Sequence, residues 1–412
     1  MTTTDMPITP ASRPAGPTLG GPNGLAAHTH TGAKRTAGVA SHLHPLASAA
    51  VDDHPVPTAK NELWKFAPLR RLRGLHADAE FSVGGLTATW DAVDGADVRV
   101  VSGAAAKGLK GVSDYLPTDR TTARLMEANP DTLLIDVPAG ATIAEPITVT
   151  LDGGDASITE AAHVLVRLGD HARATVVLRE QGSATVTHLV EFSVGDGADL
   201  NVATIADWAA DTVQLAHHHI AVGRDATIKH SVLTFGGEVV RTAVDVDYRG
   251  PGGNVELLGL YFADAGQYLE HRIFVDHTFP NCRSEVLYKG ALQGEHARTA
   301  WVGDVLIRST AEGTDSYEMN RNLLLTDGSR ADSVPNLEIE TGEIIKAAHA
   351  SATGRFDDDH LFYLQSRGIS PEVAKRLVVR GFFHEVLHKV GIDQVIEHIT
   401  ETVERELAIT GY

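Results

Sequence analysis

The sequence predicts a mainly β protein built as a parallel β-solenoid, with helical regions before and after it. Two observations predict the solenoid: glycine turns recur at a nearly constant interval, and short runs of alternating apolar and polar residues lie between them. A third observation, a change to helical spacing near the C-terminus, predicts the closing helices. The chain has 412 residues, more than one globular core usually serves unless that core is elongated as in a solenoid.

The N-terminal segment is rich in Thr, Pro, Gly, Ala and His and contains few large apolar residues. Such a segment buries too little surface to offset its ordering entropy, so we expect residues 1–58 to be a disordered tail. A helical or mixed region is expected over residues 59–136. Its first part has apolar residues at roughly helical spacing, interrupted by Pro68. These apolar residues are Trp64, Phe66, Leu69 and Leu72.

The glycine turns define the repeat. They fall at Gly140, Gly169, Gly195, Gly223 and Gly250, so that successive positions differ by 29, 26, 28 and 27. A glycine in such a turn supplies a positive φ or allows close backbone approach. A period in the twenties suits solenoid coils, in which each coil buries its inner face only by stacking on its neighbours. We therefore predict a solenoid core over residues 137–345. An antiparallel β-sandwich remains the alternative, and the repeat weakens after Gly250 before it partly returns.

Residues 346–412 are expected to form a C-terminal helical region. Ser370 is a suitable N-cap for a helix whose first residue is Pro371, and a last amphipathic helix follows from Asp393. The helix from Pro371 has more apolar residues than one core face needs, so we expect part of it to contact a partner. The residues expected at that contact are Phe382, Phe383, Val386 and Leu387.

Composition excludes several classes of function. Lysine and arginine number 35 and acidic residues 54, which gives a net charge of 35 − 54 = −19. A surface this acidic repels phosphate backbones and anionic lipid, so binding to nucleic acid or membranes is not expected. Cys282 is the only cysteine, so no intrachain disulfide can form. With no recognisable secretory signal or apolar span, these features predict a soluble cytoplasmic protein.

Three groups of residues are candidates for chemistry. His217 and His219 share one face of a predicted strand, with His218 on the other, so a metal site would need a ligand from a neighbouring coil. A polar outer face is the simpler interpretation. Asp245 and Asp247, together with the acids of residues 357–359, allow a solenoid enzyme acting on acidic polysaccharide. No aromatic platform for sugar stacking accompanies either acidic group.

His349 is the third candidate, and it lies in a run of alanines that offers no polar partner. Taken alone, it is either a ligand or a satisfied core histidine. The lone thiol of Cys282 is a weak candidate ligand, because a buried structural cysteine is the usual case.

Several longer motifs resemble one known family. They are "NELWKFAPL", "NCRSEVLYKG", "MNRNLLLTDGSRADSVPNLEI", "AAHASATGRFDDDHLFYLQSRGIS" and "AKRLVVRGFF", spread over residues 60–390. Together they resemble the SufB/SufD scaffolds of iron–sulfur cluster assembly, the SUF system, and within that family the SufD subunit. The resemblance implies a right-handed parallel β-helix, a SufB-like paralogue and a SufC-like ATPase as partners, and no catalytic residue. The C-terminal helices would then bind the ATPase.

The resemblance also implies a role for His349, which matches the family histidine at the SufB–SufD interface, where iron or a forming cluster is held. Some relatives have cysteine two residues earlier, where this chain has Ala347. Iron–sulfur clusters take mainly thiolate ligands, typically four. One histidine and one cysteine cannot close such a site, so the isolated chain is expected to bind no stable cluster, and a partner must supply ligands for a transient cluster or iron. A SufB-like homodimeric scaffold with its own cluster remains an alternative.

Overall fold

The computed structural model describes residues 43–355 and 364–409. Of the segment expected to be a tail, residues 1–42 lie outside this description, whereas residues 43–58 are folded. They include a short 3₁₀ helix, η1 (Val51–Asp53), and the buried side chain of Leu43. The imidazole of His54 bonds to the carbonyl of Ser48 over 2.8 Å, so local polar contacts hold a segment that is poor in apolar residues.

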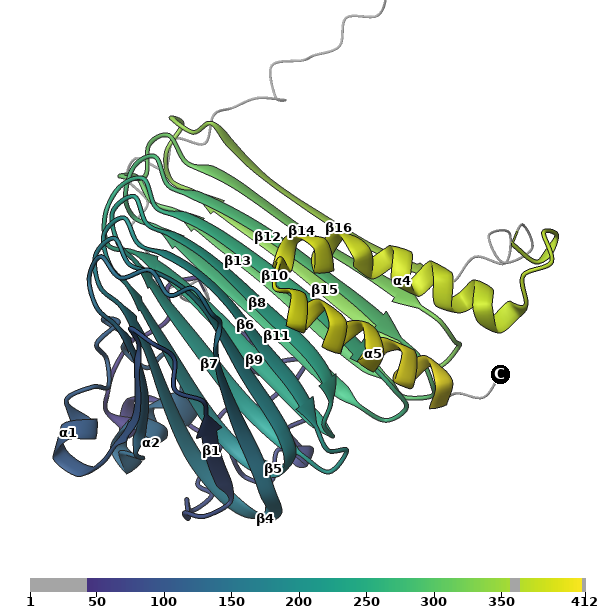
Figure 1. Cartoon of the computed structure of the whole chain (residues 1–412), viewed down its shortest axis with the longest axis horizontal. Coiled ribbons are helices and arrows are strands. Elements are labelled where there is room, and N and C mark those ends of the chain that lie inside the picture. The colour runs from purple at the N-terminus through teal and green to yellow at the C-terminus, as the bar shows by residue number, and fades with distance from the viewer. Residues whose placement is uncertain (1–42, 356–363, 410–412) are drawn as a thin grey trace, which may run out of the picture. The chain divides into compact units, whose positions relative to one another are not determined.

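Strands β4 to β16 form a parallel β-solenoid of about eight turns, which confirms the predicted fold class (Figure 1). One face follows the order β5-β7-β9-β11-β13-β15 and the other β6-β8-β10-β12-β14-β16, and all these neighbours pair in parallel. The antiparallel sandwich is therefore wrong. The strands are β4 (Ile147–Leu168), β5 (Arg173–Val194), β6 (Asp199–Trp208), β7 (Val213–Val222), β8 (Thr227–Gly236), β9 (Val239–Tyr248), β10 (Asn254–Ala263), β11 (Tyr268–His277), β12 (Arg283–Leu292), β13 (Arg298–Ile307), β14 (Asp315–Leu324), β15 (Arg330–Ile339) and β16 (Lys346–Arg355).

Most of the repeated glycines stand where turns of neighbouring coils stack, whereas Gly140 has a positive φ of 72° and open space at its Cβ position. A Cβ atom on Gly195 would lie 2.7 Å from the backbone nitrogen of Asp170, and one on Gly223 would lie 2.7 Å from that of Asp196. Real Cβ atoms do not approach this closely, so these positions require glycine for packing and not for a positive φ. The carboxylates of Asp170 and Asp196 accept backbone N–H groups of the next turn over 2.9 and 2.8 Å.

The repeat weakens after Gly250 because the coils become longer. The register of paired strands gives the length of each coil. Thr227 pairs with Asn254 (254 − 227 = 27), and Asn254 pairs with Arg283 (283 − 254 = 29). Arg283 then pairs with Asp315 (315 − 283 = 32). The strands keep the same length, so the connections between them take up the increase.

The N-terminal region covers the first coils. Strands β1 (Leu86–Trp90) and β2 (Asp97–Val101) pair antiparallel with β4 and β3 (Thr132–Val137), and β3 pairs in parallel with β4. Two helices, α1 (Gly103–Lys107) and α2 (Arg120–Ala128), lie between β2 and β3. In place of the helix interrupted at Pro68, the structure has two 3₁₀ turns, η2 (Glu62–Trp64) and η3 (Leu69–Arg71).

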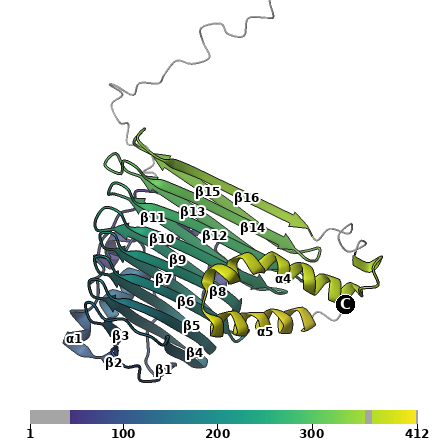
Figure 2. The same cartoon turned by 45° about the horizontal axis from the view of Figure 1, so that its top comes forward.

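Two C-terminal helices lie side by side on the face made by the even-numbered strands (Figure 2). They are α4 (Pro371–Val390) and α5 (Asp393–Ile409). Ser370 caps α4 as predicted, because its side-chain oxygen accepts the backbone N–H of Val373. Apolar side chains of α4 and α5 form one core with outward-facing residues of β8, β10 and β12, such as Leu258 and Leu287.

The solenoid ends in strands β15 and β16, and each has only one paired neighbour among the described strands. Segment 346–355, which the sequence assigns to the helical region, is therefore the outermost strand of one face. Most side chains of β16 are exposed, and those of β15 are mostly half-buried. We call this the open end of the solenoid.

Candidate functional site

His349 lies on β16 at the open end. Its register partner on β14 is Glu318, whose partner on β12 is Val286, a residue of the core inside the solenoid. Side chains at one register position share a face of a parallel sheet. The imidazole of His349 therefore stands on the inward face of the last coil, yet it is exposed because no further described strand covers it.

The interior beneath His349 is polar. The hydroxyl of Tyr261 donates to Asn322 over 2.7 Å, and the amide of Asn322 donates to Asn320 over 2.8 Å. Ser333 on β15 donates to the same oxygen of Asn320 over 2.8 Å, and Ser351 on β16 donates to Ser333 over 2.8 Å. These hydrogen bonds connect the edge strands β15 and β16 to Tyr261 on β10.

Glu318 is part of this interior and is 2% exposed. Burial, with a smaller contribution from the negative charge of Asp304, raises the pKa of Glu318 to about 8. Neither carboxyl oxygen has a hydrogen-bond partner among the described residues. No sequence pattern marks Glu318 as a ligand, because its position under His349 depends on the strand register.

Cys282 lies apart from His349. It directly precedes β12, and β14 separates that strand from β16. Along the ladder it is level with Ile345, four residues from His349. Strand spacings then place the two residues about 16 Å apart. The thiol is buried 3.6 Å from the carbonyl oxygen of Gly250, and burial raises the pKa of Cys282, so the thiol is not poised to act as a thiolate ligand.

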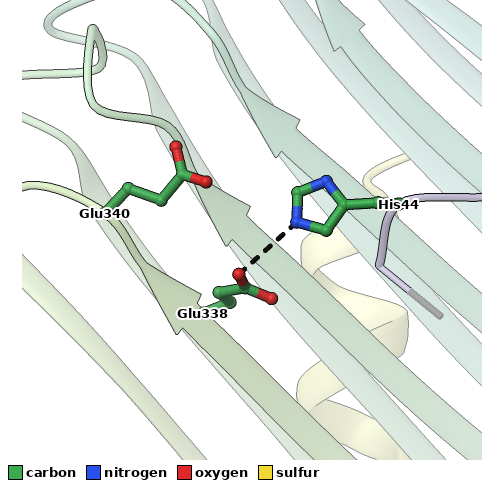
Figure 3. Close-up of side chains that lie close together, drawn as sticks. All are labelled: His44, Glu338 and Glu340. Carbon is green, nitrogen blue, oxygen red and sulfur yellow. Dashed lines mark hydrogen bonds and ion pairs between the residues drawn. The ribbon is translucent and has the colours of Figure 1, made fainter. Parts of the chain in front are cut away.

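A second group of ligand atoms lies at the end of β15. His44, Glu338 and Glu340 each bring one nitrogen or oxygen atom within 4.8 Å of the others (Figure 3). His44 Nε2 is 3.4 Å from the carboxylate of Glu338, and the guanidinium of Arg308 is 3.3 Å from His44 Nδ1. That positive neighbour disfavours a cation here. Sequence reasoning missed the group because His44 and Glu338 stand far apart in the chain (338 − 44 = 294).

The side chains of the histidine triplet are engaged with other residues of the chain. His217 and His219 pair with Asp245 and Asp247 over 3.0 and 2.9 Å. All three histidines are buried, so the polar outer face expected for them is instead covered, in part by Tyr115, whose ring contacts those of His217 and His219.

These pairings also weaken the polysaccharide hypothesis. The carboxylates of Asp245 and Asp247 are held by imidazoles and do not form a free acid–base pair. The acids of residues 357–359 lie outside the described residues.

The expected partner-binding residues on α4 divide into two groups. Phe383 and Val386 are fully buried in the core with the solenoid, whereas Phe382 and Leu387 are half-buried. A groove of about 560 Å³ runs between α4 and α5. The residues that line it include Leu377, Arg380, Phe383, His384, Leu387 and Val403.

Comparisons with known proteins identify the family. Residues 150–382 match the family described as "SUF system FeS cluster assembly, SufBD core domain". The chain is also 49% identical over 372 residues to an iron–sulfur cluster assembly SufBD family protein of Mycobacterium bovis, an alignment that covers 89% of this chain and 93% of that protein. The chain belongs to the SufBD family. It is also 26% identical to the iron–sulfur cluster assembly protein SufD of Escherichia coli, over 89% of this chain and 92% of that one.

As a SufBD protein, the chain has a role in iron–sulfur cluster assembly by the SUF system. SufBD proteins are scaffolds, generally non-catalytic, and usually work in a SufBCD complex. Within the described residues, no helix is long and apolar enough to cross a membrane.

Proposed function

We propose that this chain is the SufD-like, non-catalytic subunit of a cytoplasmic scaffold that builds iron–sulfur clusters with a SufB-like paralogue and a SufC-like ATPase. The similarity to the SufD protein of E. coli along nearly the full length of both chains supports this assignment. A cluster or its iron would be cargo, held only while the complex is assembled.

The observation that carries the proposal is the position of His349 at the open end. Its imidazole is exposed on the outermost strand, and it has no hydrogen bond or ion pair within the described part of the chain. A neutral imidazole is a good iron ligand, and strand edges with unpaired N–H and C=O groups suit contact with another chain. His349 would therefore meet a ligand set contributed by the partner.

The position of Cys282 supports a shared site. The thiol is buried, and the strand spacings place it about 16 Å from His349. This chain therefore brings no thiolate to the open end. A cluster at His349 needs thiolates, which the SufB-like partner would supply.

The groove between α4 and α5 is the proposed docking site for the ATPase. Its apolar floor includes Phe383 and Leu387, and Arg380 and His384 give it polar edges. Phe382 and Val386 lie on the side of α4 that packs on the solenoid, so they hold α4 in place and do not line the groove. The proposed contact residues are thus Leu377 and Leu387, with Phe383 at the base.

Co-purification of the tagged full-length chain from its native cells, followed by cluster assembly assays, tests the proposal. We expect a SufB-like protein and an ATPase to accompany the chain. His349→Ala should keep both partners but greatly reduce cluster assembly, and Arg355→Ala, on the same exposed strand, should not. Recovery of the chain only as a homodimer with its own cluster would favour the SufB-like alternative. Cluster assembly at the wild-type rate by His349→Ala would remove the ligand role.

A further inference from the structure

Glu318 differs from the other buried glutamates of this chain. Glu180 accepts a hydrogen bond from Gln214 over 2.8 Å, Glu191 accepts one from the Ser113 hydroxyl, and Glu270 accepts one from Tyr268 over 2.9 Å. Glu318 has no such partner for either oxygen among the described residues. An unsatisfied buried polar group costs stability, because it has lost its hydrogen bonds to water without replacement.

The structure leaves room for the Glu318 carboxyl group. Gly303 on β13 lies across the interior, and a Cβ atom on that glycine would stand 2.9 Å from Glu318 Oε2. The indole of Trp301 closes the same space, because that Cβ atom would also stand 2.3 Å from its ring. Any larger residue at position 303 would displace the carboxyl group from the space beside Gly303 and Trp301.

His349 lies directly over Glu318 in the direction of the open end. The two residues are register partners on the inward faces of β16 and β14, strands that stand about 4.8 Å apart. Imidazole and carboxylate groups bind first-row metals at about 2.0–2.2 Å, so two such side chains on adjacent strands can reach one ion. Histidine and carboxylate ligands together suit Fe²⁺, as in mononuclear iron sites.

We propose that Glu318 is a second iron ligand of this chain and completes, with His349, the share of the site that this subunit contributes. The inference rests on the proposed function, since it places iron at the open end. It explains why a carboxyl group with no protein partner stands under the exposed histidine: the metal ion is its partner. The site would receive Fe²⁺ from the open end, with thiolates of the partner closing it.

Anoxic titration of Fe²⁺ into the full-length chain, as purified with its accompanying proteins, tests this assignment. Replacing residues that only orient metal ligands already weakens binding about 10–100-fold, so Glu318→Gln should weaken the His349-dependent site at least about tenfold. Glu343→Gln, an exposed acid between β15 and β16, is the matched control and should bind as the wild type does.

The outcomes separate the inference from the proposed function. If His349→Ala loses the site and Glu318→Gln binds Fe²⁺ as tightly as the wild type, Glu318 is not a ligand and the proposed function stands. If His349→Ala also binds as the wild type does, both the inference and the role of His349 are wrong. If no partner accompanies the chain, the proposed function fails, and unchanged Fe²⁺ binding by Glu318→Gln in the chain alone would still overturn the inference.

Thermal unfolding in the presence of a chelator gives a readout independent of iron. Glu318→Met removes both unpaired oxygens and keeps a side chain of similar length, so the melting temperature of the metal-free protein should rise. A structural role for the carboxyl group predicts the reverse. A fall in the melting temperature would therefore overturn the assignment.

Discussion

The ring of Tyr288 occupies the space that a side chain at Gly259 would need. The two residues are register partners on β12 and β10, and a Cβ atom on Gly259 would lie 1.9 Å from Tyr288 Cδ1. The relationship is reciprocal two residues later, where a Cβ atom on Gly290 would lie 1.9 Å from the ring of Tyr261. On each strand a glycine thus makes room for the tyrosine ring of the other strand, and both rings are fully buried.

Gly259→Ala is therefore expected to lower the free energy of unfolding by about 2–3 kcal/mol, because overpacking a dense core forces side chains and backbone to shift. Chemical denaturation followed by circular dichroism measures the change. Gly354→Ala on β16 is the control, since among the described residues no atom beyond its chain neighbours lies within 4 Å of its Cβ position, and it should be neutral or slightly stabilising. Equal stability of the two variants would contradict the tyrosine–glycine packing.

Buried histidines predict that acid destabilises the fold. Burial lowers the pKa of His230, His271 and His277 to about 3, against about 6.5 in the unfolded chain. Between these values the unfolded state binds more protons, so stability is fully present above about pH 6.5 and is lost as the pH falls toward 3. Three such groups remove about 4 kcal/mol per pH unit between about pH 6 and 3.

Urea denaturation at pH 8, 6 and 5 measures this dependence. His277→Gln should reduce the slope below pH 6 by about 1.4 kcal/mol per pH unit, because one buried imidazole no longer titrates. A free energy of unfolding that is constant or rises on acidification would show that these imidazoles are not buried in the neutral form.

Lys389 fastens the end of α4 to the solenoid. Its ammonium group donates to Glu256 on β10 over 2.7 Å and to Glu285 on β12 over 2.8 Å. The three side chains are partly exposed, so we expect Lys389→Met to cost about 1–2 kcal/mol of unfolding free energy. Arg405→Met breaks a single, more exposed ion pair to Asp207 and should cost less than about 0.5 kcal/mol.

Hydrogen exchange distinguishes local from global effects of Lys389→Met. Faster exchange confined to α4 and α5 is the expected result, because the lost bonds join these helices to the sheet. Uniform acceleration over the solenoid strands would argue against this local role.

The docking proposal is tested on the outer surface of α4. Leu377 lines the groove between α4 and α5, whereas Val373 does not line it, and each side chain is 46% exposed. Leu377→Asp should abolish co-purification of the ATPase without unfolding the chain, and Val373→Asp should leave it unchanged. Loss of the ATPase from both variants, or from neither, would place the contact elsewhere.

The repeat was predictable because the early turns stack so closely that one position in each leaves no room for a side chain. Gly169, Gly195 and Gly223 each stand against the backbone of the preceding turn, so packing keeps them in sequence at a steady interval. The later coils lack that signal, because their connections lengthen while the strands do not. For this reason the sequence places residues 346–355 in the helical region, whereas they form the edge strand β16.

The candidate site was only partly predictable. His349 was found by its motif, whereas Glu318 depends on a strand pairing between residues 349 − 318 = 31 positions apart. Likewise, Asp245 and Asp247 looked like free acids because their histidine partners come from a different coil. Phe383 and Val386 looked like surplus apolar residues because the face of the solenoid that covers them cannot be seen in the sequence of α4.

The open end of the solenoid exposes the chain to aggregation before a partner binds. An uncovered β-strand edge is a template for growth, and a solenoid offers two such strands side by side. Lys346, Arg355 and Arg330, charged residues at the ends of these strands, oppose uncontrolled addition. Synthesis in step with the partner, and not affinity alone, would then decide whether a new chain becomes a subunit or the seed of a fibre.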